Sequence, residues 1–173
     1  MGRRTEMADV VILGCGYIGI ELGRQLTDAG HDVVGVRRSE SGCAAIEDAG
    51  FTAHRADLTS HADREELPDA DWLVFAASSG GRDAEAAQAI YVDALQAAID
   101  EYGSRESTPD RLVYTSSTGV YGDHDGEWVD ESTPLEPTTD KTEVLVEAER
   151  IALDESRDQG IDGTVARFSG LYG

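Results

Sequence analysis

The glycine-rich stretch at residues 10–19 constrains the fold more than any other part of the chain. It reads Val-Val-Ile-Leu-Gly-Cys-Gly-Tyr-Ile-Gly, an apolar run that ends in the pattern G-x-G-x-x-G. Apolar residues then recur on one helical face, and a glycine stands where that helix should end: Ile18, Leu22, Leu26, Ala29 and Gly30. This order of strand, tight turn and helix predicts a dinucleotide-binding unit. A glycine-rich turn in another kind of α/β protein is the alternative.

Each glycine of the pattern has its own physical task in such a unit. Gly14 permits the sharp turn at the end of the strand, and Gly16 lets the backbone approach a pyrophosphate because it has no Cβ. Gly19 allows the helix to pack close to the sheet. We expect the phosphates to bind at the N-terminus of this helix, at the N–H groups of its first turn around Tyr17 and Ile18.

Strand-like and helical segments alternate along the rest of the chain. The expected strands are residues 9–14, 31–37, 51–56, 71–77, 111–116 and 161–168. The expected helices are residues 17–29, 44–49 after a cap at Ser41, 83–102 and 141–159, with a loop or helical turn over 60–67 and a long irregular loop over 117–140. Such alternation predicts an α/β fold, a doubly wound parallel (Rossmann) sheet with strand order 3-2-1-4-5-6 in three layers, α/β/α.

The charge of the chain excludes some classes of partner. Its 173 residues include 35 acidic and 14 basic side chains, which gives a net charge of −21. Such a surface repels nucleic acid and anionic membranes, and no apolar run approaches the roughly 20 residues of a membrane span. We interpret the charge as a solvated acidic coat of the halophilic kind, with an acidic surface for a protein partner as the alternative. The coat predicts loss of structure in dilute buffer and recovery in molar KCl.

Length and cysteine usage bear on the number of domains and on the presence of a metal site. The length suits one domain, expected to cover residues 1–173. Neither Cys15 nor Cys43 has metal-ligand spacing and the histidines are scattered, so we expect no metal site. Residues 1–9 contain no apolar segment of a signal peptide, which favours a cytoplasmic location.

The residues at the end of the second expected strand favour NADP over NAD. An NAD site has an acidic side chain there, about 20 residues after the glycines, that accepts hydrogen bonds from the ribose. This chain has Arg37 and Arg38 instead, and a guanidinium group can hold a 2′-phosphate with two hydrogen bonds. Ordinary surface arginines are the alternative. Asp57 and Leu58, after the third expected strand, are expected to border the adenine, with a simple turn aspartate as the alternative.

Several segments, in this order, resemble the extended short-chain dehydrogenase/reductase superfamily in its NAD-dependent epimerase/dehydratase branch. The matching pieces span essentially the whole chain: residues 14–19, Ala-Asp-Leu at 56–58, Phe-Ala-Ala-Ser at 75–78, Tyr-Thr-Ser-Ser-Thr-Gly-Val-Tyr-Gly at 114–122, Asp-Glu-Ser-Thr-Pro at 130–134 and Arg-Phe-Ser-Gly-Leu-Tyr-Gly at 167–173. The Ser-Ser-Thr-Gly-Val-Tyr-Gly run is the most specific of them. The resemblance implies that Ala76, Ala77, Ser78 and Ser116 also contact the cofactor, and that Ser117 is the serine that hydrogen-bonds the substrate oxygen. A structural serine that caps the end of the strand is the alternative for Ser117.

The chain also departs from the pattern of that superfamily. Members usually have one more residue between the first two glycines, and a Tyr-x-x-x-Lys pair that supplies the general acid/base. Counting from Tyr121 without a gap places Lys141 at the position of the tyrosine and Leu145 at that of the lysine. The chain therefore looks like an atypical member without this dyad. The motif at residues 172–173 is followed in the family by a substrate lobe, so the chain looks like the amino-terminal, cofactor-binding portion of a longer protein.

Two functional hypotheses follow from the resemblance. The first is an NADP-dependent oxidoreductase or epimerase acting on a hydroxyl or carbonyl group of a small molecule, with nucleotide sugars as one substrate class. Tyr121 is then a candidate surrogate acid, although to act as a base near neutral pH it would need a pKa well below about 10. Lys141 is a second candidate unless it is a solvated charge. The alternative is a non-catalytic NADP-binding redox sensor or regulator. Relatives often dimerise through the two helices placed here at 83–102 and 141–159.

Overall fold

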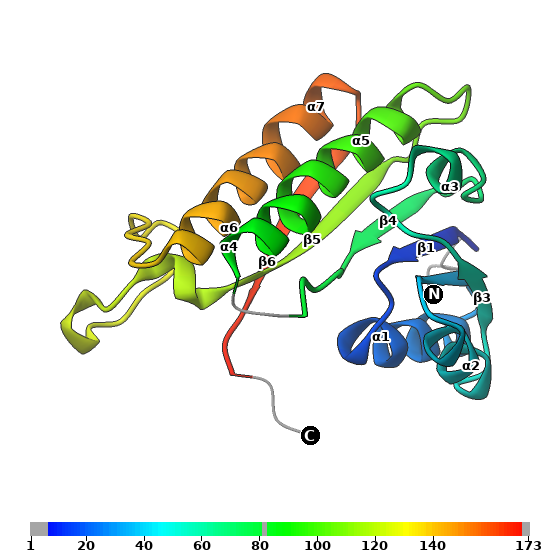
Figure 1. The fold of residues 1–173 in the computed structure, drawn as a ribbon, viewed down its shortest axis with the longest axis horizontal. Helices are drawn as coiled ribbons and strands as arrows, with labels where there is room; N and C mark the ends of the chain where they lie inside the picture. Colours follow the sequence, from blue (N-terminus) through cyan, green and yellow to red (C-terminus); the bar gives the residue numbers. More distant parts are fainter. Residues whose placement is uncertain (1–6, 81–82, 171–173) are drawn as a thin grey trace, which may run out of the picture.

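The sheet has the predicted topology. The computed structural model describes residues 7–80 and 83–170, and its six parallel strands are arranged in the order β3-β2-β1-β4-β5-β6 (Figure 1). The strands are β1 (Asp9–Leu13), β2 (Asp32–Arg37), β3 (Thr52–Arg55), β4 (Trp72–Phe75), β5 (Arg111–Ser117) and β6 (Asp162–Phe168). In the centre, Val11 of β1 lies opposite Val34 of β2 and Leu73 of β4. The α/β, doubly wound fold is thus confirmed.

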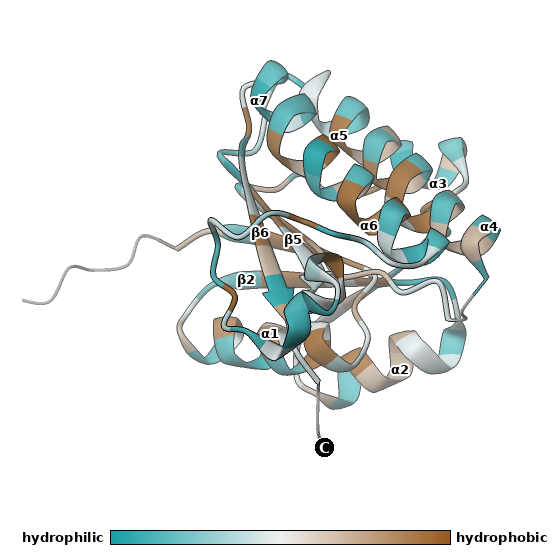
Figure 2. Ribbon diagram, turned by 90° about the vertical axis from the view of Figure 1, so that its left-hand side faces the viewer, coloured by the Kyte–Doolittle hydropathy of each residue, from teal (hydrophilic) through white to brown (hydrophobic). Residues whose placement is uncertain are grey.

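Helices cover both faces of the sheet. One face carries α1 (Tyr17–Asp28) and α2 (Glu40–Asp48), and the other carries the pair of long helices, α4 (Ala84–Ala87) through α5 (Leu95–Gly103) and α6 (Asp140–Arg150) through α7 (Ser156–Asp158) (Figure 1). The short α3 (His61–Glu65) follows β3. Figure 2 shows apolar residues gathered between these layers and hydrophilic residues outside.

Alternate residues of β1 belong to two separate apolar cores. Val10 and Ile12 pack with Ile46 and Phe51 on the face of α1 and α2. Val11 and Leu13 belong to the larger core under the long helices. The strand is apolar along its whole length because both of its faces are buried, as expected in a parallel sheet.

Several predicted boundaries are corrected. The N-cap of α2 is Ser39, whose side chain accepts a hydrogen bond from the Gly42 N–H, and not Ser41. Ala29 lies outside α1 and is exposed, so it is not part of the buried helix face. β4 ends at Phe75 rather than at residue 77, which leaves the next residues free to turn over the sheet edge.

The two long helices contain π-helical segments that the sequence pattern did not predict. Residues Gln88–Ala94 form η1 between α4 and α5, and residues Ile151–Glu155 form η4 between α6 and α7. A π-helical turn inserts one residue into the helical repeat, and such turns frequently occur at functional sites. The first of these segments carries Tyr91.

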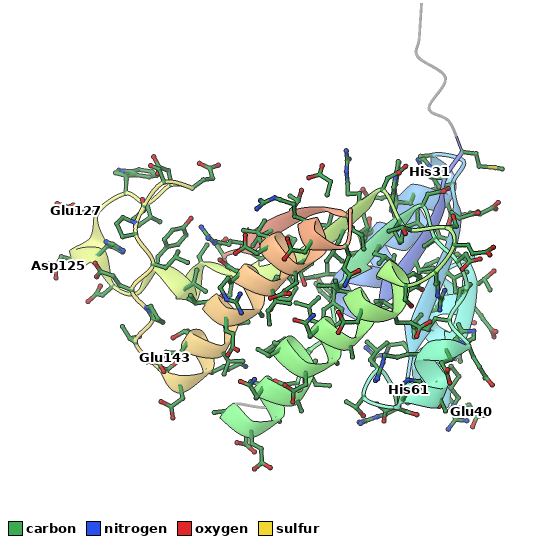
Figure 3. All side chains as sticks on the ribbon, turned by 90° about the horizontal axis from the view of Figure 1, so that it is seen from above. His31, Glu40, His61, Asp125, Glu127 and Glu143 are labelled. Atoms are coloured by element: carbon green, nitrogen blue, oxygen red, sulfur yellow. The ribbon has the colours of Figure 1, made fainter. Side chains whose placement is uncertain are left out.

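The segment at 117–140 is less irregular than predicted. β5 continues to Ser117, and two short 3-10 helices follow, η2 (Thr118–Tyr121) and η3 (His124–Gly126). The outer part of this segment projects from the body of the molecule, with the labelled Asp125 and Glu127 at its end (Figure 3). Within the described residues, no helix is long and apolar enough to cross a membrane.

Candidate functional site

The glycine turn after β1 is tightly enclosed. Gly14 has a φ of +78°, and a Cβ there would overlap the Cα of Ala77, which follows β4. A Cβ at Gly16 would lie 2.8 Å from Nη1 of Arg37, and one at Gly19 would lie 3.0 Å from Ile12 and 3.1 Å from the sulfur of Cys15. Gly14 therefore makes the predicted turn and Gly19 the predicted close helix contact, whereas the close neighbour of Gly16 is Arg37 and the approach of a pyrophosphate to Gly16 stays a prediction.

The N-terminus of α1 starts at this turn. Its N-cap is Gly16, which has no side chain to accept hydrogen bonds from the first turn, where Tyr17 and Ile18 lie. The positive end of the twelve-residue helix is thus placed beside the glycine turn, where it favours bound phosphate. Cys15, within the turn, is not a nucleophile near neutral pH. Burial raises the pKa of its thiol to about 12, although the charge of Arg37 opposes this effect.

A cleft of about 400 Å³ opens beside the turn, along the carboxyl ends of the strands. It is lined by Gly14, Val36, Arg37, Arg38, Ser39, Ala56, Asp57, Leu58, Thr59, Ala77, Ser78, Ser79, Ala86, Ala89 and Ile90. Seven of the predicted cofactor residues therefore meet in one cleft: Gly14, Arg37, Arg38, Asp57, Leu58, Ala77 and Ser78. Gly16, Tyr17, Ile18, Gly19, Ala76 and Ser116 are not in its lining. Ligands of open α/β sheets bind at this edge.

Three lining residues come from the first long helix and were not predicted. They are Ala86, Ala89 and Ile90, and Ile90 also packs against the larger core. All three are only half-buried. An alanine-rich helix gives no signal that distinguishes a face packed on the sheet from a face packed on a ligand.

Arg37 and Arg38 occupy different positions at the end of β2. The side chain of Arg37 runs between the glycine turn and α2, because its Nε would lie 2.8 Å from a Cβ at Gly42. Arg38 is more exposed, with its Nη1 3.9 Å from Oδ2 of Asp57. Hydrogen bonds from the hydroxyl and N–H of Thr59 hold the pKa of Asp57 below its ordinary value, and the charge of Arg38 adds to this effect. Asp57 is thus both a turn residue and a residue of the cleft.

The end of β5 holds the candidate catalytic residues. Ser117 is half-buried, and its hydroxyl accepts a hydrogen bond from the Gly119 N–H at 3.1 Å. The hydroxyl of Tyr121 accepts one from Nη1 of Arg167 at 2.7 Å, and the same guanidinium group pairs with the buried Glu149 at 2.7 Å. Tyr121 is therefore part of a buried structural network, and its proposed role as an acid stays a prediction.

Two features bear on the missing dyad and on metals. Leu145 is buried in the core, so no charged group occupies the position of the family's lysine. Lys141, in the first turn of α6, is half-buried beside Asp83 and Asp140 rather than fully solvated. Over residues 7–80 and 83–170, the structure has no group of three or more histidine, cysteine or acidic residues that could hold a metal ion.

Comparison with known proteins agrees with this architecture. The model of the NAD-dependent epimerase/dehydratase family matches residues 10–173. Protein YeeZ of Escherichia coli strain K12 is 32% identical over 151 residues, which make up 83% of this chain and 52% of YeeZ. The chain thus spans about half the length of that curated relative.

Solved structures show the same relationship. A Methylobacillus flagellatus structure described under the heading of NAD-dependent epimerase/dehydratases is 31% identical, with a TM-score of 0.78 over 97% of this chain and 56% of its own. The UDP-glucuronic acid 4-epimerase of Bacillus cereus, solved with NAD, has a TM-score of 0.80 at 18% identity over 95% of this chain and 57% of its own. The second likeness supports the fold alone.

Proposed function

Because the chain belongs to the NAD-dependent epimerase/dehydratase family, we propose that it binds NADP in the cleft beside the glycine turn. We further propose that it serves an oxidoreductase or epimerase reaction at a hydroxyl or carbonyl group of a small molecule, with nucleotide sugars as one substrate class. In this proposal residues 1–173 form the cofactor-binding domain.

The position of Arg37 carries the preference for NADP. Its guanidinium group lies against Gly16, the glycine whose backbone is to approach the pyrophosphate, so it borders the place of the adenosine ribose. A guanidinium group donates hydrogen bonds and suits a 2′-phosphate, whereas the ribose hydroxyls of NAD favour an acceptor. Asp32 is at the first residue of β2, at the opposite end of the strand from Arg37.

The reaction class depends on the family and on the end of β5. Ser117 ends that strand at the edge where ligands of open α/β sheets bind, which suits a hydrogen bond to a substrate oxygen. A non-catalytic NADP-binding sensor is the second candidate, and the buried Leu145 in place of a dyad lysine favours it.

The proposal is tested by calorimetric titration of NADPH and of NADH into the chain in molar KCl. High salt screens the repulsion between an anionic cofactor and a protein of net charge −21. We expect NADPH to bind more tightly than NADH, and Arg37→Asp to weaken NADPH binding by at least about tenfold, the loss expected for one charge-assisted phosphate contact. Arg157→Asp is the matched control, because Arg157 lies on α7 outside the cleft.

The outcomes separate the parts of the proposal. Equal binding of both cofactors that is indifferent to Arg37→Asp would contradict the NADP preference but leave a dinucleotide site. Absence of binding by either cofactor would contradict the site itself. Where NADPH binds, loss of the absorbance of its reduced nicotinamide over hours with carbonyl substrates supports an enzyme, and binding without turnover supports the sensor.

A further inference from the structure

A buried tyrosine on the π-helical segment η1 is absent from all the roles described so far. Tyr91 is 9% exposed and belongs to the core under the long helices, yet its hydroxyl accepts a hydrogen bond from the Ser79 N–H at 3.4 Å. Ser79 follows β4 and lines the cleft. Ile90, the neighbour of Tyr91 in the chain, also lines it. Tyr91 thus lies directly behind the cofactor cleft, with its polar end at the carboxyl edge of the sheet.

Charged and ionisable groups surround this hydroxyl from two neighbouring elements. Burial by itself would raise the pKa of Tyr91, but hydrogen bonds with Ser79 and Ser78 and the charge of Lys141 lower it below its ordinary value. Lys141 belongs to the first turn of α6, which packs against η1. Tyr114 faces this site from β5. Burial raises the pKa of Tyr114, and the negative charge of an ionised Tyr91 raises it further. Glu149 of α6 acts on Tyr114 in the same direction.

Two unsatisfied hydroxyl groups lie on the adjacent strand. Tyr114 and Ser116 are 1% and 8% exposed, and neither side-chain oxygen has a hydrogen-bond partner in the part of the chain that the structure describes. They are two residues apart on β5, so both side chains point to the face of the sheet that the long helices cover. Buried hydroxyls are rarely left unpaired in proteins, which points to a polar ligand or water beside them.

We propose that Tyr91 is the proton-transferring residue of this site and that Lys141 stabilises its ionised form, so that the pair replaces the missing Tyr-x-x-x-Lys dyad from two different helices. The assignment rests on the proposed function, because it requires a dinucleotide in the cleft. Lys141 stands where the dyad tyrosine would stand, and α6, which carries it, packs against η1, which carries Tyr91.

The chemistry balances with the residues at hand. A carbonyl group that becomes a hydroxyl takes one hydride at carbon, which the reduced dinucleotide supplies when bound, and one proton at oxygen. Tyr91 gives that proton: its O–H bond breaks, an O–H bond forms on the substrate, and a tyrosinate remains. The ammonium group of Lys141 and the Ser79 N–H stabilise the tyrosinate until solvent returns the proton. Oxidation of a hydroxyl runs through the same groups in reverse.

The test is a titration of tyrosinate absorbance on the whole chain in molar KCl. Free tyrosine ionises near about pH 10. We expect one of the six tyrosines to ionise earlier than the others, and this early step to be absent in Tyr91→Phe. Lys141→Met should move the step upward by about one pH unit, since an opposite charge at short range shifts a pKa by about that much or more. Lys141→Arg, which keeps the positive charge, should return the early step to its wild-type pH.

Tyr114→Phe is the matched control. It removes a buried hydroxyl from the same core, but one that has no partner among the described residues and a raised pKa, so the early step should remain. The proposal is overturned if Tyr91→Phe keeps the early step, or if Lys141→Met leaves the step where it is in the wild type.

A second titration, with saturating NADP⁺, tests the position of Tyr91 against the cofactor. The proposal requires the nicotinamide of bound NADP⁺ to lie near the phenol, where its positive charge would move the early step to still lower pH, and calorimetry on the same samples reports whether the cofactor binds. Binding without any movement of the step would overturn the proposal while leaving the cofactor site intact. Failure of NADP⁺ to bind would instead count against the proposed function, and against this inference with it.

Discussion

The two sides of the sheet achieve close packing by different chemical means. On the nucleotide side, which comprises β1–β3 with α1 and α2, the elements approach because side chains are absent. A Cβ at Gly23 of α1 would overlap the ring of Phe51, and one at Gly35 would lie 2.8 Å from the sulfur of Cys15. On the helix-pair side, which comprises β5 and β6 with α4–α7, buried polar groups lie between the elements: the Glu149–Arg167 pair and the hydroxyl of Tyr121.

This difference explains what could be predicted from sequence. The three glycines that form the turn after β1 and begin α1 lie within a few residues of one another, so the G-x-G-x-x-G pattern and the alternation of strands and helices were enough for the fold. The polar pairs of the helix-pair side join residues 18 and 46 positions apart, and no local pattern connects them. Tyr91 was missed for the same reason, since its partners come from the β4 edge and from α6.

The candidate site divides along the same line. Arg37, Asp57 and Ala77 follow the ends of β2, β3 and β4, and parallel strands end at a common edge, so their meeting in one cleft was predictable. Helix faces were harder to assign, because a π-helical turn such as η1 shifts the phase of the repeat on which the apolar stripe was based. Ile90 packs against the core, as its place in an apolar stripe predicts, and it also borders the cleft, which the sequence pattern could not show.

The largest effect should come from adding one methyl group on the nucleotide side. Gly14→Ala places a side chain at a left-handed position and against the backbone of Ala77. We expect a loss of about 4 kcal/mol in the free energy of unfolding, from backbone strain and overpacking together. Gly30→Ala is the control, because Gly30 has a φ of +92° but nothing within 4 Å of its Cβ position. That variant should cost only about 1 kcal/mol.

Urea unfolding of both variants in molar KCl provides the measurement. If the two variants lose equal stability, the close contact with Ala77 contributes nothing, and the contrast drawn between the two sides fails at its best-defined point.

A smaller loss is expected from breaking the buried ion pair on the helix-pair side. Glu149→Gln keeps the shape of the side chain but leaves the guanidinium group of Arg167 without its charged partner. The side chain of Glu149 is 4% exposed and that of Arg167 is 20% exposed, so we expect a loss of about 3 kcal/mol, the low end for a broken buried pair. Asp154→Asn, at the exposed pair with Arg157, should cost under about 0.5 kcal/mol.

The same unfolding experiment reports both values. A Glu149→Gln variant as stable as Asp154→Asn would mean that water reaches the pair, and that the helix-pair side does not depend on buried polar contacts.

The smallest effect distinguishes two copies of one local motif. The motifs are Asp57-x-Thr59 in the cleft and Asp130-x-Ser132 in the projecting segment. In each, one carboxylate oxygen of the aspartate accepts hydrogen bonds from the hydroxyl and the N–H of the residue two positions later. In both motifs the hydrogen bond from the hydroxyl group contributes most to lowering the pKa of the aspartate. A lowered pKa means that the stabilisation is present above about pH 4, the unfolded value, and is lost as the pH falls through the folded value.

Thr59→Ala and Ser132→Ala should therefore each raise the pKa of their aspartate, as followed by NMR titration of the carboxyl carbons. Only Thr59→Ala should also weaken NADPH binding, by about threefold for one lost neutral hydrogen bond that orients a cleft residue. Equal effects of the two variants on binding would show that Asp57 is a turn residue alone, because Asp130 lies outside the cleft lining. An effect of Thr59→Ala alone would indicate that this turn motif belongs to the nucleotide site, through the orientation of Asp57 or through the hydroxyl of Thr59, which also lines the cleft.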